Sequence, residues 1–237
     1  LGSRKGTLKF AVTATETGLD LAITGAKAPD PQTRMALGQV PVARLTVDGD
    51  PIAHHNPPTI HIDGIPVTPP PGAFLQATEH GEGALLAAVK DIIGDATSAV
   101  DLFAGCGTFA LPLAKGAEVH AVEGQAELTD AMTTAWRGAQ LKRMTTETRD
   151  LFRRPLVQSE LKYAAAVIDP PRAGAEAQVA EFAGSQIPRI AMVSCNPVTF
   201  ARDAKALIHA GFTLNWIEVV DQFRWSPHIE LVGSFTR

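Results

Sequence analysis

The sequence predicts an α/β protein, with a doubly wound sheet over residues 73–237 and a β-rich segment over residues 1–72. Two observations predict this fold class. From Ala73 onward, apolar runs typical of strands alternate with amphipathic helical runs. Near Ala99 an apolar strand leads into Gly105-Cys106-Gly107 and then into a helix, and sheets of this kind bind ligands beyond the carboxyl ends of their strands.

Residues 1–72 are expected to form strands and turns that cover the catalytic part or face the substrate. Two hairpins are predicted, residues 8–15 with 19–23 and residues 59–62 with 65–67. Seven of the 17 prolines lie between Pro51 and Pro71, which excludes a long helix there and places a domain edge at residues 69–72.

Three histidines in this segment, His54, His55 and His61, raise the question of a metal site. They fall at predicted strand positions, and we expect them to lack carboxylate partners. Solvated or packing roles are therefore favoured over metal binding.

The second part is predicted to contain seven strands, the last two pairing as an antiparallel edge. The predicted strands are residues 99–103, 118–122, 144–148, 164–168, 189–193, 213–220 and 229–235. The predicted helices are residues 79–93, 108–114, 126–138, 175–184 and 198–210.

The glycine-rich turn has the features of a nucleotide-binding loop. Gly105 lets the backbone approach a ligand closely, and the free N–H groups of a helix beginning near Thr108 would point at that ligand. Glu123 follows 18 positions later at the end of the next strand, where a carboxylate can bind a ribose. This pattern fits a nicotinamide enzyme almost as well, and a plain strand-turn-helix is also compatible with it.

Three further loops at strand ends carry reactive side chains. Asp169 precedes two prolines that hold the backbone extended, Cys195 lies between a strand and the helix that begins near Val198, and Glu230 stands at the start of the last strand. A helix N-terminus and cations such as Arg172 or Arg202 favour the thiolate form of Cys195. Taken alone, Cys195 could be an inert buried thiol and Glu230 a solvated edge residue.

Charge and cysteine content limit the possible partners. A net charge of −4 and a pI near 6.0 give no general attraction to nucleic acid, so an RNA partner requires a local basic patch. Two cysteines are too few for a disulfide scaffold, a structural zinc site or an iron–sulfur cluster, which favours a reducing, cytoplasmic setting. No apolar run approaches the ~18 residues of a membrane span.

Considered together and in order, the motifs resemble those of the RNA uracil-C5 methyltransferases, which make 5-methyluridine in ribosomal and transfer RNA. The resemblance covers residues 73–237. The matching motifs are Phe74-Leu75-Gln76, the run from Asp101 to Gly107, the run from Asp169 to Gly174, Ser194-Cys195-Asn196-Pro197 and the run from Pro227 to Glu230. The order of seven strands resembles the class I S-adenosylmethionine-dependent methyltransferase fold.

The resemblance implies roles for individual residues. Cys195 is the implied nucleophile, Glu230 the implied base, and Asp169 belongs to both the catalytic set and the cofactor site. The residues expected to contact S-adenosylmethionine are Gln76, Phe103, Gly105, Thr108, Glu123, Asp150 and Asp169. No metal ion is needed, and we expect a monomer.

The chain departs from the family pattern in three places. The family often has Asn where Thr108 stands, and Asn within the helix where this chain has Thr133-Thr134. Family members usually carry an N-terminal oligonucleotide-binding barrel, and some carry an iron–sulfur cysteine cluster, neither of which is found in this sequence. We therefore expect residues 1–72 to be part of a larger N-terminal region.

The implied chemistry explains the residue types. Carbon 5 of uracil is a weak nucleophile, so a thiolate must first add to carbon 6, and a carboxylate must later remove the carbon-5 proton. Because the base must leave its stack, loops or single-stranded RNA are the expected substrates.

Several alternatives stay open from the sequence. A cytosine-C5 methyltransferase would carry a cysteine where Arg172 follows the paired prolines, and an adenine-N6 methyltransferase usually has an aromatic residue in that loop. A non-catalytic RNA-binding fragment is also compatible with the sequence. For the target, 23S ribosomal RNA is the first choice and the transfer RNA T-loop the second. The densest basic cluster comprises Lys142, Arg143, Arg149, Arg153 and Arg154, which could contact phosphates or form a solvated face.

Overall fold

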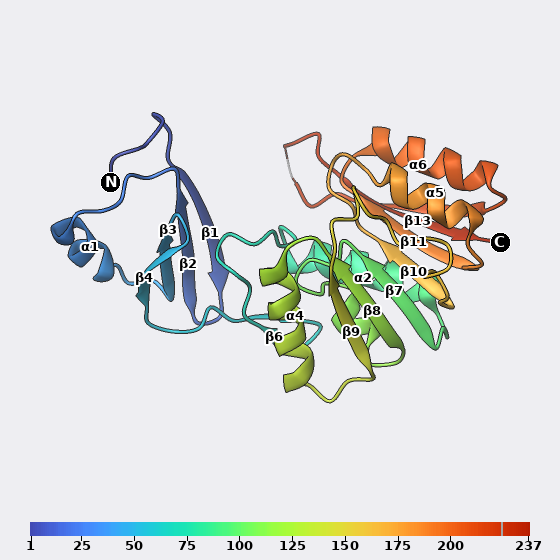
Figure 1. The fold of residues 1–237 in the computed structure, drawn as a ribbon, viewed down its shortest axis with the longest axis horizontal. Helices are drawn as coiled ribbons and strands as arrows, with labels where there is room; N and C mark the ends of the chain where they lie inside the picture. The colour runs from blue at the N-terminus through green and yellow to red at the C-terminus, as the bar shows by residue number, and fades with distance from the viewer. Residues whose placement is uncertain (224) are drawn as a thin grey trace. The chain divides into compact units, whose positions relative to one another are not determined.

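The fold is described from a computed structural model, in which residues 1–223 and 225–237 are described (Figure 1). These residues form two compact units, Leu1–Phe74 and Leu75–Arg237. None of the helices within the described ranges is long and apolar enough to cross a membrane.

The first unit contains a four-stranded sheet in the order β1-β2-β3-β4. The strands are β1 (Lys9–Thr15), β2 (Gly18–Thr24), β3 (Arg44–Val47) and β4 (Asp50–His54). The pair β2 and β3 is parallel, whereas the other neighbours are antiparallel. A separate hairpin joins β5 (Ile60–Ile62) and β6 (Ile65–Val67). Both hairpins predicted from the sequence are therefore confirmed, with small shifts at their ends.

A short helix, α1 (Pro31–Gly38), lies between β2 and β3. The prediction of only strands and turns in residues 1–72 is therefore wrong for this segment. Asp30 caps the helix by accepting a hydrogen bond from the Thr33 N–H at 2.7 Å, and Pro31 occupies the first turn. An Asp-Pro pair is a recognised helix start, so the signal was present but short.

A buried ion pair links two strands of the first unit. Arg44 Nη2 lies 2.6 Å from Asp20 Oδ2, and Arg44 Nε donates to Asp20 Oδ1 at 2.8 Å. The Asp20 side chain is only 2% exposed. Because the guanidinium fork binds both carboxylate oxygens, the pair holds the parallel strands β2 and β3 together beside a small apolar core.

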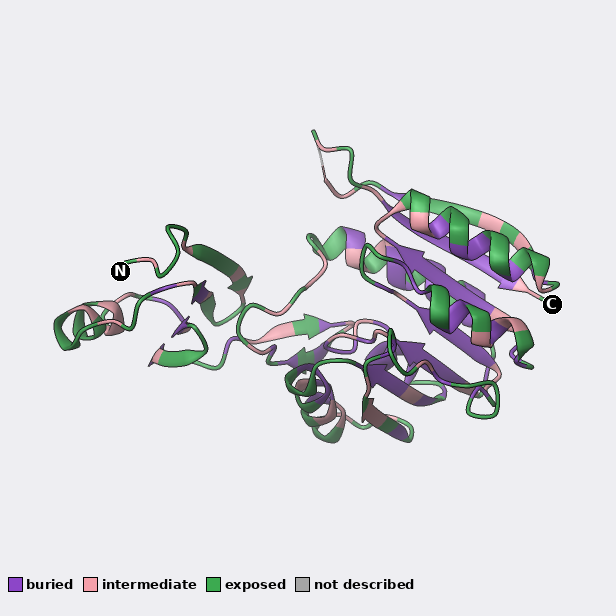
Figure 2. Ribbon diagram, turned by 45° about the horizontal axis from the view of Figure 1, so that its top comes forward, coloured by how far each residue is buried: buried purple, intermediate pink, exposed green. Residues whose placement is uncertain are grey.

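The second unit is built on a seven-stranded sheet in the order β12-β13-β11-β10-β7-β8-β9. The strands are β7 (Ser98–Leu102), β8 (Glu118–Glu123), β9 (Met144–Thr148), β10 (Ala165–Ile168), β11 (Arg189–Ser194), β12 (Thr213–Val220) and β13 (Glu230–Thr236). The last two strands pair antiparallel at one edge of the sheet, as predicted, with β12 outermost. The strand β13 lies between β12 and β11 and runs opposite to both. Figure 2 shows that the central strands are buried almost throughout.

Helices cover both faces of this sheet. They are α2 (Glu79–Ile93), α3 (Ala110–Leu113), α4 (Ala126–Gly138), α5 (Glu176–Gly184) and α6 (Pro197–His209). The helix α5 packs beside α6, as Figure 1 shows, and α6 packs on β11 and β12. On the other face, α2 packs on β10 to β13, while α3 and α4 pack on β7 to β9.

The helix predicted over residues 108–114 is wrong in length. The chain turns through residues 105–109, and α3 begins only at Ala110. The reason is Pro112, which lacks the N–H group that a helix starting at Thr108 would need for its first hydrogen bond. Thr108 therefore lies in the turn, partly buried, and not at a helix N-terminus.

Candidate active site

The predicted site residues converge at one edge of the seven-stranded sheet. The strands β7, β10 and β11 are parallel, so Phe103, Asp169 and Cys195 follow their carboxyl ends. Glu230 reaches the same edge because β13 is antiparallel to β11, with Leu231 opposite Ser194. The Asp169 N–H donates to the Leu102 carbonyl at 3.2 Å, which extends the parallel ladder to the start of the loop. The sheet topology thus places side chains from distant motifs beside one another.

The glycine turn leaves room for a ligand. Gly105 has φ 57° and Gly107 has φ 96°, a backbone conformation that strongly favours glycine. A Cβ atom at Gly107 would lie 2.8 Å from the Leu111 side chain, so this glycine allows close packing. A Cβ atom at Gly105 would meet no atom within 4 Å, so the backbone there borders open space.

Glu123 is held against this turn by backbone donors. The Gly105 N–H donates to Glu123 Oε2 at 3.0 Å, and the Gln125 N–H donates to Oε1 at 3.0 Å. The side chain is 9% exposed. A carboxylate oxygen has two lone pairs, so each oxygen can still accept a hydrogen bond from a ligand hydroxyl.

Two phenylalanines flank the turn. Phe103 has φ 61°, an uncommon value for a non-glycine residue, and its ring lies 5.3 Å from that of Phe152 between centroids. The Phe152 ring is about half exposed. Asp150 shapes the loop that carries Phe152, because its Oδ1 accepts the Phe152 N–H at 3.0 Å and its Oδ2 lies 3.5 Å from Arg153. Phe152 was not among the residues predicted to form the site.

Asp101 is a buried acid for which the sequence predicted no role. Its side chain is inaccessible to solvent, and among the described residues neither carboxylate oxygen has a hydrogen-bond partner that meets standard geometry. Burial raises the pKa of Asp101 well above its usual range, and the nearby charges of Asp169 and Glu123 raise it further. The only sequence signal was an acid within an otherwise apolar strand.

The loop that carries Cys195 is fixed to the loop that follows Asp169. Asn196 caps α6 by accepting the Val198 N–H at 3.0 Å, and its Nδ2 donates to the Arg172 carbonyl at 2.9 Å. Thr199 donates to the same carbonyl at 3.3 Å. Asn196 therefore positions the loop, a role that the sequence motif alone did not show.

Cys195, Asp169 and Glu230 form an acidic cluster. Burial raises the pKa of Glu230 above its ordinary value. Burial and the charge of Glu230 raise the pKa of Asp169 to about 7. Burial, Glu230 and Asp169 raise the pKa of the Cys195 thiol, while Arg172 lowers it only weakly.

The expected stabilisation of a Cys195 thiolate is therefore wrong, because the pKa of the thiol is raised. Acids outweigh Arg172, and Arg202 pairs with Asp203 at 2.7 Å. Cys106 differs from Cys195 because it is only 1% exposed and burial raises its pKa to about 12. Cys195, which is partly exposed, is the more accessible thiol of the two.

Gln76 approaches the acidic cluster from the segment before α2. Its Oε1 accepts a hydrogen bond at 2.9 Å from Nε2 of Gln222, in the connection between β12 and β13. Burial raises the pKa of Glu230, and the neighbouring Gln222 amide lowers it. Gln222 was not predicted to belong to the site.

Two secondary expectations need correction. His61 does have a carboxylate partner, Glu16 Oε1, at 2.6 Å.

Arg149 is not available for phosphate because it binds Glu147 at 2.6 Å and Glu160 at 2.7 Å. Over residues 1–223 and 225–237, no group of three or more His, Cys, Asp or Glu side chains could hold a metal ion.

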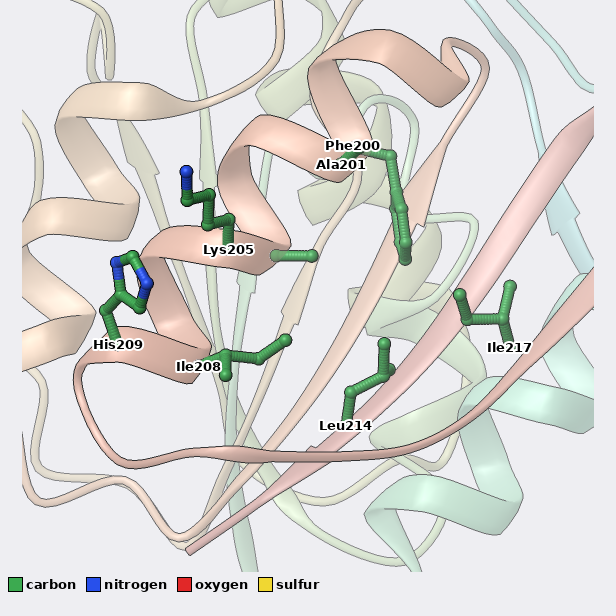
Figure 3. Close-up of a pocket in the computed structure, with 8 residues that line it drawn as sticks. Phe200, Ala201, Lys205, Ile208, His209, Leu214 and Ile217 are labelled. Carbon is green, nitrogen blue, oxygen red and sulfur yellow. The ribbon is translucent and has the colours of Figure 1, made fainter.

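A separate groove of about 320 Å³ lies between α6 and β12. Figure 3 shows Lys205, Ile208 and His209 on the helix, opposite Leu214 and Ile217 on the strand. None of the predicted site residues lines this groove, so its walls belong to a different part of the sheet from the acidic cluster.

Comparison with known proteins identifies the family. A family model described as tRNA (Uracil-5-)-methyltransferase matches residues 70–236. A Rhizobium meliloti (strain 1021) protein named as an uncharacterized RNA methyltransferase is 48% identical over 235 residues, covering 97% of this chain and 57% of that protein. The 23S rRNA (uracil(1939)-C(5))-methyltransferase of Halomonas elongata is 35% identical over 171 residues, covering 68% of this chain and 35% of that protein. The chain thus spans a little over half the length of the first curated relatives that it matches.

A solved structure shows the same fold. Pyrococcus abyssi tRNA (uracil-54, C5)-methyltransferase in complex with S-adenosyl-L-homocysteine superimposes with a TM-score of 0.80 at 21% identity, covering 98% of this chain and 60% of that chain. This likeness confirms the predicted class I methyltransferase fold. The family match over residues 70–236 confirms the resemblance read from the motifs, and the chain belongs to the tRNA (uracil-5-)-methyltransferase family.

Proposed function

We propose that this protein transfers a methyl group from S-adenosylmethionine to carbon 5 of a uridine in RNA, with Cys195 as the nucleophile and Glu230 as the base. The observation that carries the proposal is that Cys195 and Glu230 lie at neighbouring strand ends, where burial and the charge of Glu230 raise the pKa of the Cys195 thiol. Family membership supports the same reaction class. A nicotinamide enzyme would leave both residues without a role.

The site fits S-adenosylmethionine, which when bound supplies an activated methyl group on a positively charged sulfur. The lone pairs of Glu123 suit ribose hydroxyls, and the open space at Gly105 allows the ligand to approach the backbone. The rings of Phe103 and Phe152 suit a stacked base. The remaining proposed contacts to the cofactor are Gln76, Thr108, Asp150 and Asp169. The acids of the cluster favour a positively charged ligand.

The residues then act on the uracil in a fixed order. The Cys195 thiolate forms a bond to carbon 6, and the electron pair of the C5–C6 double bond moves into the enolate that makes carbon 5 nucleophilic. After carbon 5 has gained the methyl group, Glu230 accepts the proton from carbon 5. The electrons of that C–H bond re-form the double bond, and the bond between carbon 6 and sulfur breaks to release the thiolate.

For the substrate, we propose 23S ribosomal RNA first and the transfer RNA T-loop second. The first choice is supported by the 35% identical relative that is named as a 23S rRNA methyltransferase. The second is supported by the description of the matching family. We propose that the reaction takes place in the cytoplasm, as expected for either RNA. Because the chain spans a little over half of its first curated relatives, the proposal concerns the catalytic part of the reaction.

Release of tritium from RNA labelled at carbon 5 of uridine tests this function. The protein is incubated with S-adenosylmethionine and labelled transcripts of 23S rRNA and of a tRNA, and 5-methyluridine is measured by mass spectrometry of the digested RNA. We expect S-adenosylmethionine-dependent tritium release and one 5-methyluridine per tritium released. Methylated cytosine or adenine without tritium release would contradict the proposal.

A further inference from the structure

We propose that Arg153 and Arg154 bind phosphates of the RNA strand that carries the target uridine. The inference rests on the proposed function, because that function supplies the RNA, and it names the surface that holds this substrate. Both arginines belong to the densest basic cluster of the sequence, together with Lys142, Arg143 and Arg149. The structure divides these five residues into three groups, and the members of only one group lie exposed beside the site residues.

Lys142 and Arg143 lie at the opposite edge of the sheet from the site residues. They directly precede Met144, where β9 begins. The strand β9 is parallel to β8, so Glu123, at the carboxyl end of β8, pairs with Thr148 at the far end of β9. The five residues of β9 separate its two ends by about 15 Å, at ~3.3 Å per residue. These two cations therefore lie away from the site.

Arg149 anchors the loop that follows β9. Its guanidinium binds Glu147 at 2.6 Å and Glu160 at 2.7 Å, and its Nη1 donates to the Pro155 carbonyl at 3.4 Å. Its backbone N–H donates to the Glu123 carbonyl at 2.8 Å. Arg149 thus holds the start and the end of the loop in place beside Glu123, while two acids offset its own charge.

Arg153 and Arg154 occupy a hydrogen-bonded turn within this loop. The N–H groups of Arg153 and Arg154 donate to the Asp150 carbonyl at 3.2 Å and 2.8 Å. The Arg153 side chain is 87% exposed and lies 3.5 Å from Asp150 Oδ2. Arg154 is exposed and forms no ion pair with the residues that the structure describes. Because an exposed pair contributes only about 0–1 kcal/mol, Asp150 does not prevent Arg153 from binding a phosphate.

Phe152 ties this turn to the site. Its ring lies 5.3 Å from the Phe103 ring between centroids, and Phe103 follows the carboxyl end of β7. Arg153 and Arg154 come directly after Phe152 in the chain. The two arginines therefore lie next to the site, on a turn whose backbone is already ordered by hydrogen bonds.

An RNA substrate needs cations at this edge of the sheet. The chain has a net charge of −4, and Glu123, Asp169 and Glu230 place acids among the site residues. A uridine that enters the site brings the phosphates on either side of it, which these acids repel unless cations lie nearby. Arginine suits this task, because its planar guanidinium donates two parallel hydrogen bonds to a phosphate.

Two double variants test this inference. Arg153→Gln combined with Arg154→Gln removes two positive charges beside the site. Lys142→Gln combined with Arg143→Gln is the matched control, because it removes the same charge at the other end of β9. Fluorescence anisotropy measures binding to transcripts of 23S rRNA and of a tRNA at a series of salt concentrations. Tritium release measures KM and kcat, and calorimetry measures the affinity for S-adenosylmethionine.

The arginine variant should bind RNA more weakly and with less dependence on salt. We expect its affinity to fall roughly tenfold at about 0.1 M salt, and the slope of log affinity against log salt to become shallower by about 1.4, or ~0.7 for each lost phosphate contact. The KM for RNA should rise by a similar factor while kcat stays unchanged, because the arginines hold the substrate without contacting the reacting atoms. The affinity for S-adenosylmethionine should be unchanged, and the control should match the parent protein in every measurement.

Three outcomes would overturn the inference. Equal losses of RNA affinity in the two double variants would reflect net charge alone. An unchanged salt slope in the arginine variant would show that the arginines do not bind phosphate. A matching loss of S-adenosylmethionine affinity would show that they shape the cofactor site instead.

Binding and turnover are measured separately, so the inference and the proposed function can fail independently. A parent protein that shows the expected difference in RNA binding but releases no tritium would support the RNA surface and contradict the proposed function. An active parent protein whose RNA affinity does not depend on Arg153 and Arg154 would overturn only the inference.

Discussion

The Cys195 thiol and the Glu230 carboxylate lie at the ends of neighbouring antiparallel strands, and burial together with the charge of Glu230 raises the pKa of the thiol. Asp169 acts in the same direction from the end of β10. The acids that suit a cationic cofactor therefore disfavour ionisation of the Cys195 thiol.

Removing one of these charges is expected to make Cys195 more reactive. In Glu230→Gln the pKa of the thiol should fall, because a negative neighbour no longer opposes the thiolate. The pH at which iodoacetamide alkylates Cys195 at half its maximal rate should move downward. Glu218→Gln, an exposed acid on β12, is the control and should leave that pH unchanged. Equal alkylation profiles for the two variants would argue against the acidic cluster.

Glu123 is expected to provide the main polar contact for the cofactor ribose. Glu123→Ala should weaken S-adenosylmethionine binding by about 1.5–3 kcal/mol, the range for a lost charge-assisted hydrogen bond. Calorimetric titration measures the effect, with Glu127→Ala, an exposed acid in the first turn of α4, as the control. Unchanged affinity in Glu123→Ala would rule out the assigned contact.

Asp101 should make stability fall as the pH rises. The pKa of Asp101 is higher in the folded state than in the unfolded state, where it is about 4. The contribution of Asp101 to the free energy of unfolding is therefore complete below about pH 4 and is lost as the pH rises towards the pKa of the folded state. Asp101→Asn cannot ionise, so its free energy of unfolding should decline less between pH 5 and pH 8 than that of the parent. Urea unfolding at both pH values measures this, and equal declines would show that Asp101 is not a buried titrating acid.

In the first unit, stability should depend on the buried pair between Asp20 and Arg44. Asp20→Ala leaves a guanidinium with 12% side-chain exposure without its carboxylate, and breaking such a pair costs about 3–5 kcal/mol. Asp50→Ala breaks the exposed pair with Arg34, where the Asp50 side chain is 70% exposed, and should cost less than about 1 kcal/mol. Denaturant unfolding of both variants compares the two pairs. Equal losses would contradict the importance of burial.

Much of the second unit could be predicted from the sequence, because its periodic apolar runs determine strands and helices locally. The helix α4 and the strands β9 and β12 begin and end at the predicted residues. The predicted start of α3 was wrong because Pro112 lacks an N–H group, so the helix begins only at Ala110. The position of β13 between β11 and β12 depends on long-range pairing, which periodicity does not encode.

The site residues also differ in whether the sequence alone could identify them. Cys195, Asp169 and Glu230 could be found because each follows or begins a strand within a recognisable motif. Gln222 could not, because its contact with Gln76 joins residues that lie far apart in the sequence and meet only in the fold. The raised pKa of Cys195 could not be predicted from the sequence either, because it depends on burial and on acids that lie far away along the chain.

The most direct test of the mechanism uses the order in which Cys195 and Glu230 act. Glu230→Gln should methylate its RNA once and then stall, because the carbon-5 proton cannot leave and the bond to sulfur cannot break. A denaturing gel with S-adenosylmethionine and labelled 23S rRNA transcript should therefore show a covalent protein–RNA band.

The same gel includes two cysteine variants as controls for the attacking thiol. The band should disappear in Glu230→Gln combined with Cys195→Ala, and it should persist in Glu230→Gln combined with Cys106→Ala, because the Cys106 thiol is buried. A band that survives the loss of Cys195, or full turnover by Glu230→Gln, would contradict the roles assigned to the two residues.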